Sequence, residues 1–220
     1  MIQNNEIMDY LKLKNIFLEL SGGITSVIIP VKISKTHITV YSSASLVEQK
    51  CVLKLEFRNG EDFRIVCDIE KNSDEINCYN CYFDDPLPES ILVKVSELDT
   101  LFKNCNKRSE QRLEIGLENW KKFGMVRCDC NFTFNNKHTI KTIISNASYH
   151  GALLIGERSF AQIGELVIFN CAFNDCVVSQ KANIINAELI TQTYFKYALH
   201  FIDPVSLYWV KKIDEFQNLQ

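Results

Sequence analysis

The sequence predicts a mainly β protein: two small antiparallel β barrels in tandem, with a short N-terminal helix and a C-terminal helix. Three observations support this fold class. Short apolar runs with alternating side chains recur along most of the 220 residues, a polar and basic stretch interrupts them near the middle, and both ends have helical spacing. We expect the domain boundary at that stretch, giving domains at residues 1–102 and 103–220.

The first twenty residues are expected to be helical, because four apolar side chains fall roughly on one helical stripe: Ile7, Tyr10, Leu11 and Leu18. The glycines of "SGG" at 21–23 end this pattern. A hairpin is expected at 51–69, where apolar residues alternate on both arms and Asn59-Gly60 suits a turn with positive φ. With "VIIPVKI", "HITVYS", "EINCYNCYF" and "ILVKVSEL" (91–98) as further strands, residues 22 to about 98 should form a barrel or sandwich of five or six strands.

The second domain repeats this β character after the polar interruption. "GLENWKKFG" (116–124) is expected to make one or two helical turns with Leu117, Trp120 and Phe123 inward, and "MVRCDCNFTF" (125–134) then alternates as a strand. Four more strands follow, in "TIKTIISNASYHGALLIG", "ELVIFNCAF", "NIINAELITQ" and "YFKYALHFI". The tail after Pro204 predicts a helix that covers the barrel, since apolar residues recur every three positions: Leu207, Val210, Ile213 and Phe216.

Composition bounds the class of protein. Hydrophobic residues make up 46% and charged residues 23% of the chain, as in folded soluble proteins, and the net charge of −3 argues against a partner that is a nucleic-acid polymer. The longest apolar runs are far too short for a membrane span, and no basic segment followed by an apolar block opens the chain, so we expect a cytoplasmic protein. Nine cysteines, an odd number, then indicate reduced thiols.

The sequence shows little sign of catalysis. Cys78-x-x-Cys81 lies on an expected strand, where residues three apart face opposite sides, and no second such pair accompanies it. The four histidines form no metal-ligand spacing, and "SGGITS" lacks the glycine and lysine pattern of a P-loop. We therefore expect no enzyme activity, no metal and no cofactor; a cysteine-bound metal remains a minor alternative.

One basic concentration stands out. Residues 103–127 carry seven basic and three acidic side chains, a local charge of +4 in an acidic chain. Within it, Arg108 and Arg112 lie one helical turn apart, next to Lys107. The plain structural alternative is a solvated helix on which these arginines pair with acidic neighbours: Glu110, Glu114 and Glu118.

A second motif lies about thirty residues later, in "ISNASYHGALLI" (144–155). Asn146, Ser148 and Gly151 interrupt an apolar strand with hydrogen-bonding groups and a residue without a side chain. Such a break indicates a β-bulge or a binding platform at a strand, the alternative being an ordinary bulged turn.

Arg-x-x-x-Arg followed by Asn-x-Ser-x-x-Gly, in that order and in a β-rich unit, resembles the PilZ domain, a family of bacterial receptors for cyclic di-GMP. The resemblance covers about residues 103–216, including "YALHF" (197–201) at the place of a late barrel strand. It implies a ligand site made of Arg108, Arg112, Asn146, Ser148 and Gly151 on a 103–115 linker and the barrel surface. Lys107 falls where some members carry another arginine, a position that bears on whether one or two ligands bind. The chain departs from the pattern in "LEIGLENWKKFG" (113–124), which delays the first strand.

The resemblance implies a function without catalysis. Cyclic di-GMP would order the arginine linker and reorient the domains, which would relay the signal to a protein partner whose identity the sequence does not give. Some members with an N-terminal β barrel brake flagellar motors, so motility control with a flagellar motor component as partner is one implied output. The main alternative is a PilZ-like adaptor that acts through protein contacts without nucleotide.

Overall fold

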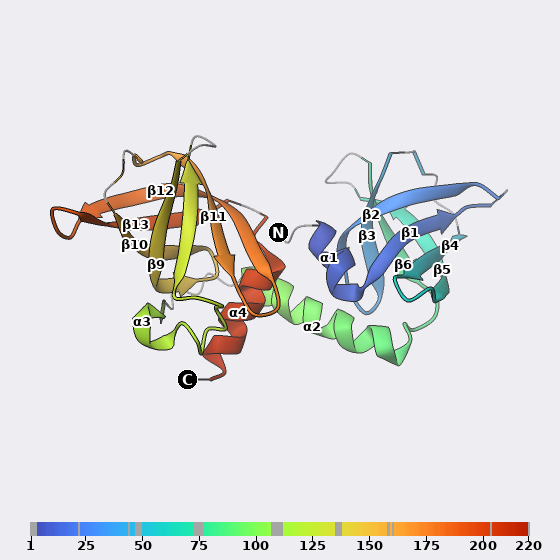
Figure 1. The fold of residues 1–220 in the computed structure, drawn as a ribbon. Coiled ribbons are helices and arrows are strands. Elements are labelled where there is room, and N and C mark those ends of the chain that lie inside the picture. Colours follow the sequence, from blue (N-terminus) through green and yellow to red (C-terminus); the bar gives the residue numbers. More distant parts are fainter. Residues whose placement is uncertain are drawn as a thin grey trace. The chain divides into compact units, whose positions relative to one another are not determined.

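The structure is a computed structural model that describes residues 4–21, 23–43, 45–46, 50–72, 77–106, 112–134, 138–157, 159, 161–202 and 204–219. The chain divides into two compact units, residues 2–103 and 104–220. Each unit is built around its own closed antiparallel barrel (Figure 1). A short helix lies near the N-terminus of the chain and another helix near its C-terminus. The predicted fold class is confirmed.

The N-terminal unit is a six-stranded barrel with the strand order β1-β2-β3-β6-β5-β4. Its strands are β1 (Leu13–Glu19), β2 (Thr25–Ile33), β3 (His37–Ser42), β4 (Lys50–Phe57), β5 (Asp62–Lys71) and β6 (Cys78–Phe83). The predicted hairpin is the β4–β5 pair, which runs from Lys50 opposite Asp68 to Glu56 opposite Asp62, and Gly60 in its turn has a φ of 90°. This hairpin prediction is confirmed, except that Phe63 is exposed instead of buried.

The expected twenty-residue helix is wrong beyond its first half. Helix α1 (Asn4–Leu11) buries Ile7 and Leu11 against β1 and β2, and it ends where Lys12 takes a left-handed φ of 60°. Strand β1 begins at Leu13, and after an irregularity between Leu13 and Asn15 its side chains alternate, so that Leu13, Ile16 and Leu18 are buried in the barrel. The spacing of the buried side chains thus changes from that of a helix to that of a strand within a few residues, and the helical stripe assumed over all twenty residues concealed this change.

The expected strand at 91–98 is also wrong, because this segment belongs to helix α2 (Glu89–Asn106). Its β-branched residues favour a strand, but the buried side chains recur at helical spacing: Ile91, Val95, Leu98 and Leu101. Val93, which strand alternation would bury with Ile91 and Val95, is exposed. The helix takes in the start of the predicted 103–115 linker. No helix in the described parts of the chain is long and apolar enough to cross a bilayer.

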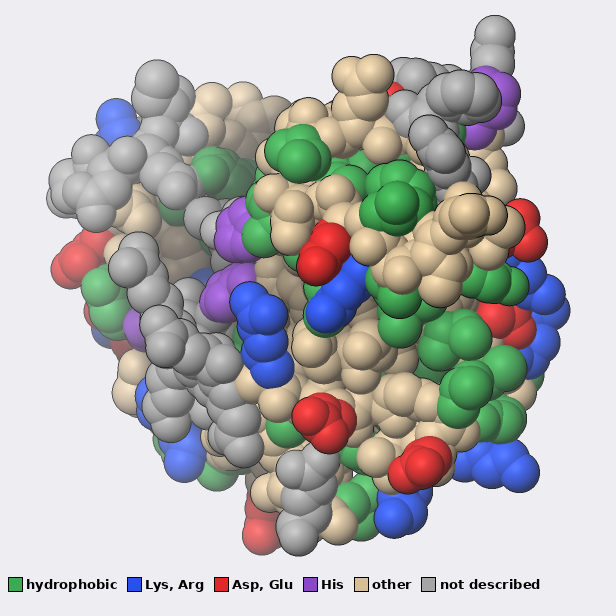
Figure 2. All heavy atoms as spheres, turned by 90° about the vertical axis from the view of Figure 1, so that its left-hand side faces the viewer, with side chains coloured by type: hydrophobic (Ala, Val, Ile, Leu, Met, Phe, Trp, Pro, Cys, Tyr) green, Lys and Arg blue, Asp and Glu red, His purple; other side chains and the backbone are tan. Residues whose placement is uncertain are grey.

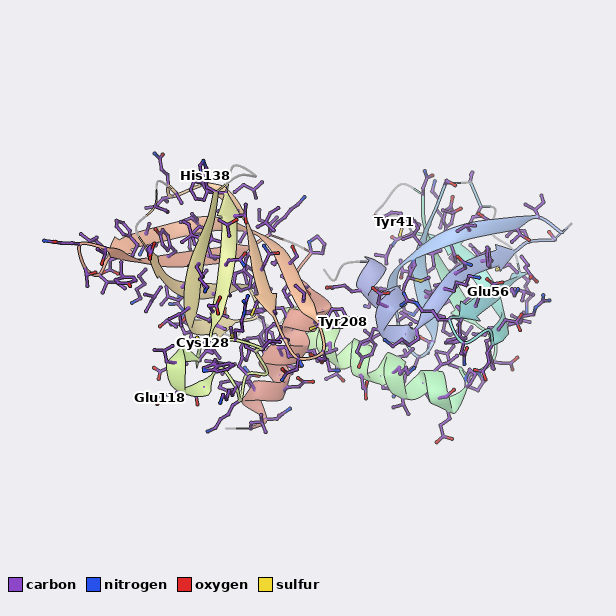
Figure 3. All side chains as sticks on the ribbon, viewed as in Figure 1. Tyr41, Glu56, Glu118, Cys128, His138 and Tyr208 are labelled. Atoms are coloured by element: carbon purple, nitrogen blue, oxygen red, sulfur yellow. The ribbon has the colours of Figure 1, made fainter. Side chains whose placement is uncertain are left out.

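The C-terminal unit has the strand order β10-β13-β12-β11-β8-β9, which β9 and β10 close into a barrel. Its strands are β8 (Asp129–Phe134), β9 (His138–Ser148), β10 (Gly151–Glu157), β11 (Leu166–Ala172), β12 (Val177–Leu189) and β13 (Tyr194–Phe201). The segment expected as one interrupted strand, 139–156, is thus a hairpin of two strands joined at Tyr149-His150. His138 begins β9 at one end of the barrel, opposite the end where Glu118 lies (Figure 3).

Residues 113–124 form a tether with three buried apolar anchors, Leu113, Ile115 and Phe123. Strand β7 (Leu113–Glu114) pairs with β9, and helix α3 (Gly116–Asn119) supplies a single turn. The predicted short helix is therefore present, but Leu117 is exposed and not inward. The strand that follows begins at Asp129, later than predicted, which leaves Val126 exposed before it.

The predicted C-terminal helix is confirmed as α4 (Leu207–Gln217). Ser206 caps it by accepting a hydrogen bond from the backbone N–H of Trp209, and six of its side chains are buried. Trp209 has no exposed surface and its ring lies edge-on to aromatic residues of the barrel and the tether: Phe123, Phe169, Phe173 and Phe201. The helix thus fixes the core of this unit.

Candidate functional site

A β-bulge in β9 turns the second motif outward. Before the bulge, the even-numbered residues Thr142 and Ile144 face the core; after it, the odd-numbered Ala147 and Tyr149 do. The extra residue is Ser145, since Ile144 pairs with Leu154 and Asn146 with Leu153. Asn146 and Ser148 therefore lie on the outer face of the barrel, half-buried, and the bulge that the sequence indicated is present.

Gly151 is required by the barrel itself. A Cβ atom at this position would lie 2.3 Å from the carbonyl oxygen of Leu199 on β13, far inside van der Waals contact. The residue pairs with Ser148 on one side and with His200 on the other, where β9, β10 and β13 come together. The need for glycine thus comes first from strand packing, whatever room it also leaves for a ligand.

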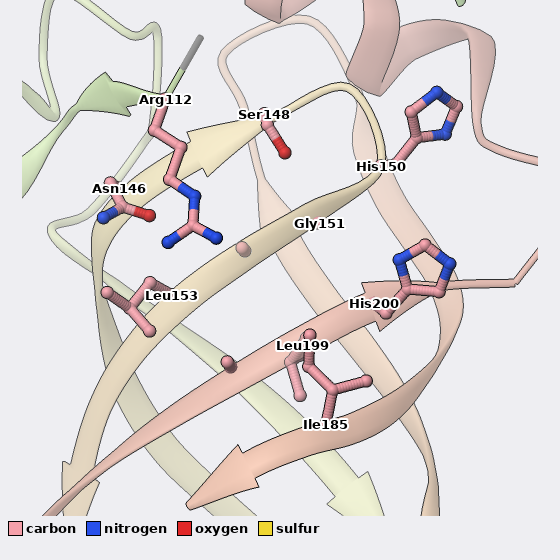
Figure 4. Close-up of a pocket in the computed structure, with 11 residues that line it drawn as sticks. Arg112, Asn146, Ser148, His150, Gly151, Leu153, Ile185, Leu199 and His200 are labelled. Atoms are coloured by element: carbon pink, nitrogen blue, oxygen red, sulfur yellow. The ribbon is translucent and has the colours of Figure 1, made fainter. Parts of the chain in front are cut away.

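The tether brings Arg112 to the second motif. Leu113 pairs with Ala147 and Glu114 with Asn146. They occupy the edge of β9 beyond Ile143, where the pairing of β9 with β8 ends. The backbone N–H of Ile115 donates a hydrogen bond of 3.0 Å to the carbonyl of the bulge residue Ser145. Arg112 directly precedes this pairing, and its guanidinium extends over the strands near Asn146 and Gly151 (Figure 4).

These residues border a shallow hollow of about 120 Å³ on the outer face of the barrel. Its described lining contains Arg112, Asn146, Ser148, His150, Gly151, Ala152, Leu153, Ile185, Ala198, Leu199 and His200 (Figure 4). Drug-sized ligands usually occupy about 300–1,000 Å³. A nucleotide-sized ligand would therefore lie across this hollow and need further walls.

The polar groups at the hollow have unused hydrogen-bonding capacity. Within the described part of the chain, the side chains of Arg112, Asn146 and Ser148 make no hydrogen bond or ion pair, and no carboxylate lines the hollow. The solvated-helix alternative requires Arg112 to pair with an acidic neighbour, but Arg112 forms no ion pair with Glu114 or Glu118. A guanidinium, an amide and a hydroxyl are thus available together to an anionic or hydrogen-bonding ligand.

Two predicted site residues, Lys107 and Arg108, lie outside the described residues, as does Glu110. The geometry therefore brings together four of the six predicted residues, namely Arg112, Asn146, Ser148 and Gly151.

The structure adds lining residues that sequence reasoning missed. Ile185 is the extra residue of a second bulge, in β12, where Ile184 pairs with Leu199 and Asn186 with Ala198. It is 54% exposed and lies with Leu153 and Ala198 on the apolar part of the hollow. The adjacent isoleucines 184 and 185 break the alternation of β12, and this pair is the feature of the sequence from which the bulge could have been predicted.

His150 and His200 line the other end of the hollow, and their imidazoles lie near each other (Figure 4). Figure 2 shows neighbouring histidine side chains beside a Lys or Arg side chain on this side of the molecule. His150 belongs to the second motif, whereas His200 comes from β13 and could be linked to it only by the strand register.

Another hollow, of about 640 Å³, lies in the N-terminal unit between the β4–β5 turn and the start of α2. Its charged lining residues are of both signs, with Lys12 and Lys94 against Glu61 and Asp62. This balance gives no preference for an anion, and none of the predicted site residues whose positions are described lines this hollow.

The described residues give no support to the metal alternative. No group of three or more His, Cys, Asp or Glu among them is placed to hold a metal ion. The eight cysteines with described side chains are free thiols, six of them buried. Burial raises the pKa of the Cys130 thiol to about 12, so this group stays protonated and serves as an apolar packing group.

No protein-family model and no curated protein matches the sequence. Similar solved structures include Borreliella burgdorferi PlzA in complex with c-di-GMP, with 19% identity, a TM-score of 0.43, and coverage of 98% of this chain and 92% of that one. K. pneumonia MrkH in its c-di-GMP complex has 12% identity and a TM-score of 0.38, with coverage of 98% of this chain and 93% of that one. Escherichia coli YcgR in complex with c-di-GMP has 12% identity and a TM-score of 0.34, with coverage of 98% of this chain and 88% of that one. These matches run over nearly the whole chain at low identity, with TM-scores below 0.5.

Proposed function

We propose that the protein is a non-enzymatic receptor for cyclic di-GMP, which binds across the hollow on the outer face of the C-terminal barrel. One observation carries the proposal. Arg112, Asn146 and Ser148 come from two separate segments, converge on one hollow, and have no partner among the described residues. Groups placed in this way are suited to an incoming ligand, since the fold itself makes no use of them.

The chemistry of the ligand matches these groups. Cyclic di-GMP carries two phosphates and two guanines, and a guanidinium can hold phosphate oxygens or the O6 and N7 atoms of guanine through a bidentate pair. Asn146 and Ser148 would supply hydrogen bonds from the barrel side. The apolar surface of Leu153, Ile185 and Ala198 would contact the face of a base. We assign to Arg108, and to Lys107 beside it, the further cationic contacts that a ligand wider than the hollow requires.

The signal would pass through the segment that joins the two units. Arg112 lies six residues after the end of α2, the helix whose last turn contains the boundary between residues 103 and 104. A ligand that holds the arginines would restrict this segment and so shift the population of interdomain arrangements. A protein partner, such as a component that controls motility, would then distinguish the bound state from the free one.

The test is a calorimetric titration of the purified protein with cyclic di-GMP. We expect wild type to bind, and Arg112→Ala to lose about 1.5–3 kcal/mol, because it removes a charge-assisted contact. Arg127→Ala is the matched control: Arg127 is an exposed arginine of the same unit that does not line the hollow, and its affinity should stay at the wild-type value. Cyclic di-AMP, which lacks guanine O6, should bind more weakly.

Absence of binding by the wild-type protein would refute the receptor proposal and leave the nucleotide-independent adaptor. Equal affinities of wild type and Arg112→Ala would instead place the site elsewhere. The stoichiometry of the titration would also establish whether one or two ligands bind beside Lys107.

A further inference from the structure

We infer that Tyr149 and Trp209 are positioning residues, which tie the ligand-binding strand to helix α4 and couple the docking of this helix to ligand binding. The inference rests on the proposed function, because it concerns how the same site is held and read out. Neither residue lines the hollow, so any effect of them on the ligand acts through Ser148 and the turn that follows it.

Two hydrogen bonds join α4 to the end of β9. The indole Nε1–H of Trp209 donates to the carbonyl oxygen of Ser148 at 2.9 Å. The hydroxyl of Tyr149 donates to the carboxylate of Asp214 and lies 3.0 Å from the side-chain amide oxygen of Gln217. Two consecutive residues of the second motif are thus held from one helix, although more than sixty residues separate them from it.

The turn at 149–150 depends on such support. Two-residue hairpin turns usually need a left-handed residue, which Asn-Gly or a similar pair provides. Tyr149, His150 and Gly151 are not among the residues with positive φ, in contrast to Gly60 in the β4–β5 turn. The conformation is therefore fixed by tertiary contacts: the links to α4, and a 2.8 Å hydrogen bond from the N–H of Phe201 to the carbonyl of His150.

The helix end of this connection is rigid. Trp209 is fully buried, with ring centroids of Phe201 at 5.2 Å and of Phe169 at 5.5 Å. A shift of the Ser148 backbone therefore changes the hydrogen bond to an indole that has little freedom to follow. By thermodynamic linkage, a ligand that favours one position of Ser148 and His150 favours the corresponding docking of α4, and the converse holds equally.

Deletion of the Tyr149 hydroxyl tests this coupling. Tyr149→Phe keeps the ring and every lining residue but removes the link to Asp214. We expect cyclic di-GMP to bind about fivefold more weakly, or worse, which is the low end of typical coupling between sites. Tyr197→Phe is the matched control, since its fully buried ring carries a hydroxyl bonded to the Glu157 carbonyl and to Ser159, and neither residue lines the hollow. This control should lose thermal stability and keep the wild-type affinity.

The fluorescence of Trp209 provides a second measurement of the coupling. The chain has two tryptophans, so Trp120→Phe leaves Trp209 as the only one. We expect cyclic di-GMP to change the fluorescence of this variant and to slow amide hydrogen exchange in α4. Affinities of Tyr149→Phe and Tyr197→Phe that both equal wild type, with no change in fluorescence or exchange, would overturn the coupling while leaving the receptor proposal intact. A wild-type protein that does not bind the ligand would overturn both.

Discussion

Single residues at the site have separable duties, and the contrast between Gly151 and Ser148 shows it best. The missing side chain of Gly151 lets β10 approach the Leu199 carbonyl, so the residue belongs to the architecture. The hydroxyl of Ser148 points outward at the hollow and has no partner among the described residues, so under the receptor proposal it serves ligand recognition. Both stand in one six-residue motif, and the motif alone did not distinguish their duties.

Stability and affinity should therefore respond differently to two alanine substitutions. Gly151→Ala places a Cβ atom against the backbone of β13, and we expect it to lower the free energy of unfolding of the C-terminal unit by about 1–3 kcal/mol. Ser148→Ala should leave the melting temperature near wild type and weaken ligand binding about two- to tenfold, the range of one neutral hydrogen bond. Calorimetric melting and titration of both variants measure the two effects. A Gly151→Ala protein as stable as wild type would contradict the packing argument.

At the scale of elements, the sequence was informative where one period governs a whole segment. The β4–β5 hairpin and α4 were predicted because alternation or three-residue spacing extends over their full length. Helix α2 was mistaken for a strand because Ile91, Val93 and Val95 satisfy alternation locally, and burial by the tertiary fold decided otherwise. The lining of the candidate site was predicted in part: the motifs supplied Arg112, Asn146 and Ser148, but Ile185 and His200 reach the hollow only through strand order and a bulge.

Helix α4 is also held by a charge cluster, which gives its docking a pH dependence. Lys212, nearly buried, contacts Asp175 in the β11–β12 turn at 2.9 Å and Glu215 at 2.9 Å. Burial acts to raise the pKa of the Asp175 carboxyl, but hydrogen bonding and the charge of Lys212 outweigh it, and the pKa is lowered. A lowered folded-state pKa means that the ion pair stabilises the fold above about pH 4, the usual aspartate value, and that this contribution disappears as the pH falls further.

Asp175→Asn should accordingly lower the melting temperature of the C-terminal unit at pH 7, by a small amount because half of the Asp175 side chain is exposed. The difference from wild type should narrow as the pH falls below about 4, since the wild-type carboxyl then becomes protonated as well. Thermal melts of both proteins between pH 3 and pH 7 measure this. A difference that stays constant over the range would contradict the assignment.

At the scale of the whole molecule, the chain consists of two closed barrels, each with its own core. The N-terminal barrel buries apolar side chains from α1 and six strands, and the C-terminal barrel is filled around Phe132, Phe169 and Trp209. Closure leaves neither barrel with a long unpaired edge through which it would depend on another chain. We therefore expect the two units to fold as separate thermodynamic entities.

Expression of residues 1–103 and 104–220 as separate chains tests this expectation. Each should give a cooperative thermal transition, and the second should bind cyclic di-GMP if Lys107, Arg108 and Arg112 are the cationic part of the site. In the intact protein, Gly151→Ala should shift one of two calorimetric transitions and leave the other in place. A single transition that moves as a whole would show that the units unfold together.

The bulge at Ser145 has a consequence for how variation in β9 should be interpreted. On one side of it, even-numbered positions such as Thr142 belong to the interior; on the other side, even-numbered Asn146 belongs to the surface. One inserted residue thus divides the strand into two stretches in which opposite sets of positions face the core. In the first stretch a substitution at an even position should disturb the packing of the core. In the second, under the receptor proposal, a substitution at an even position should change ligand binding instead. If the proposed site is correct, substitutions at a few outward-facing positions of β9 should alter ligand specificity while the core-facing residues that fold the barrel stay unchanged.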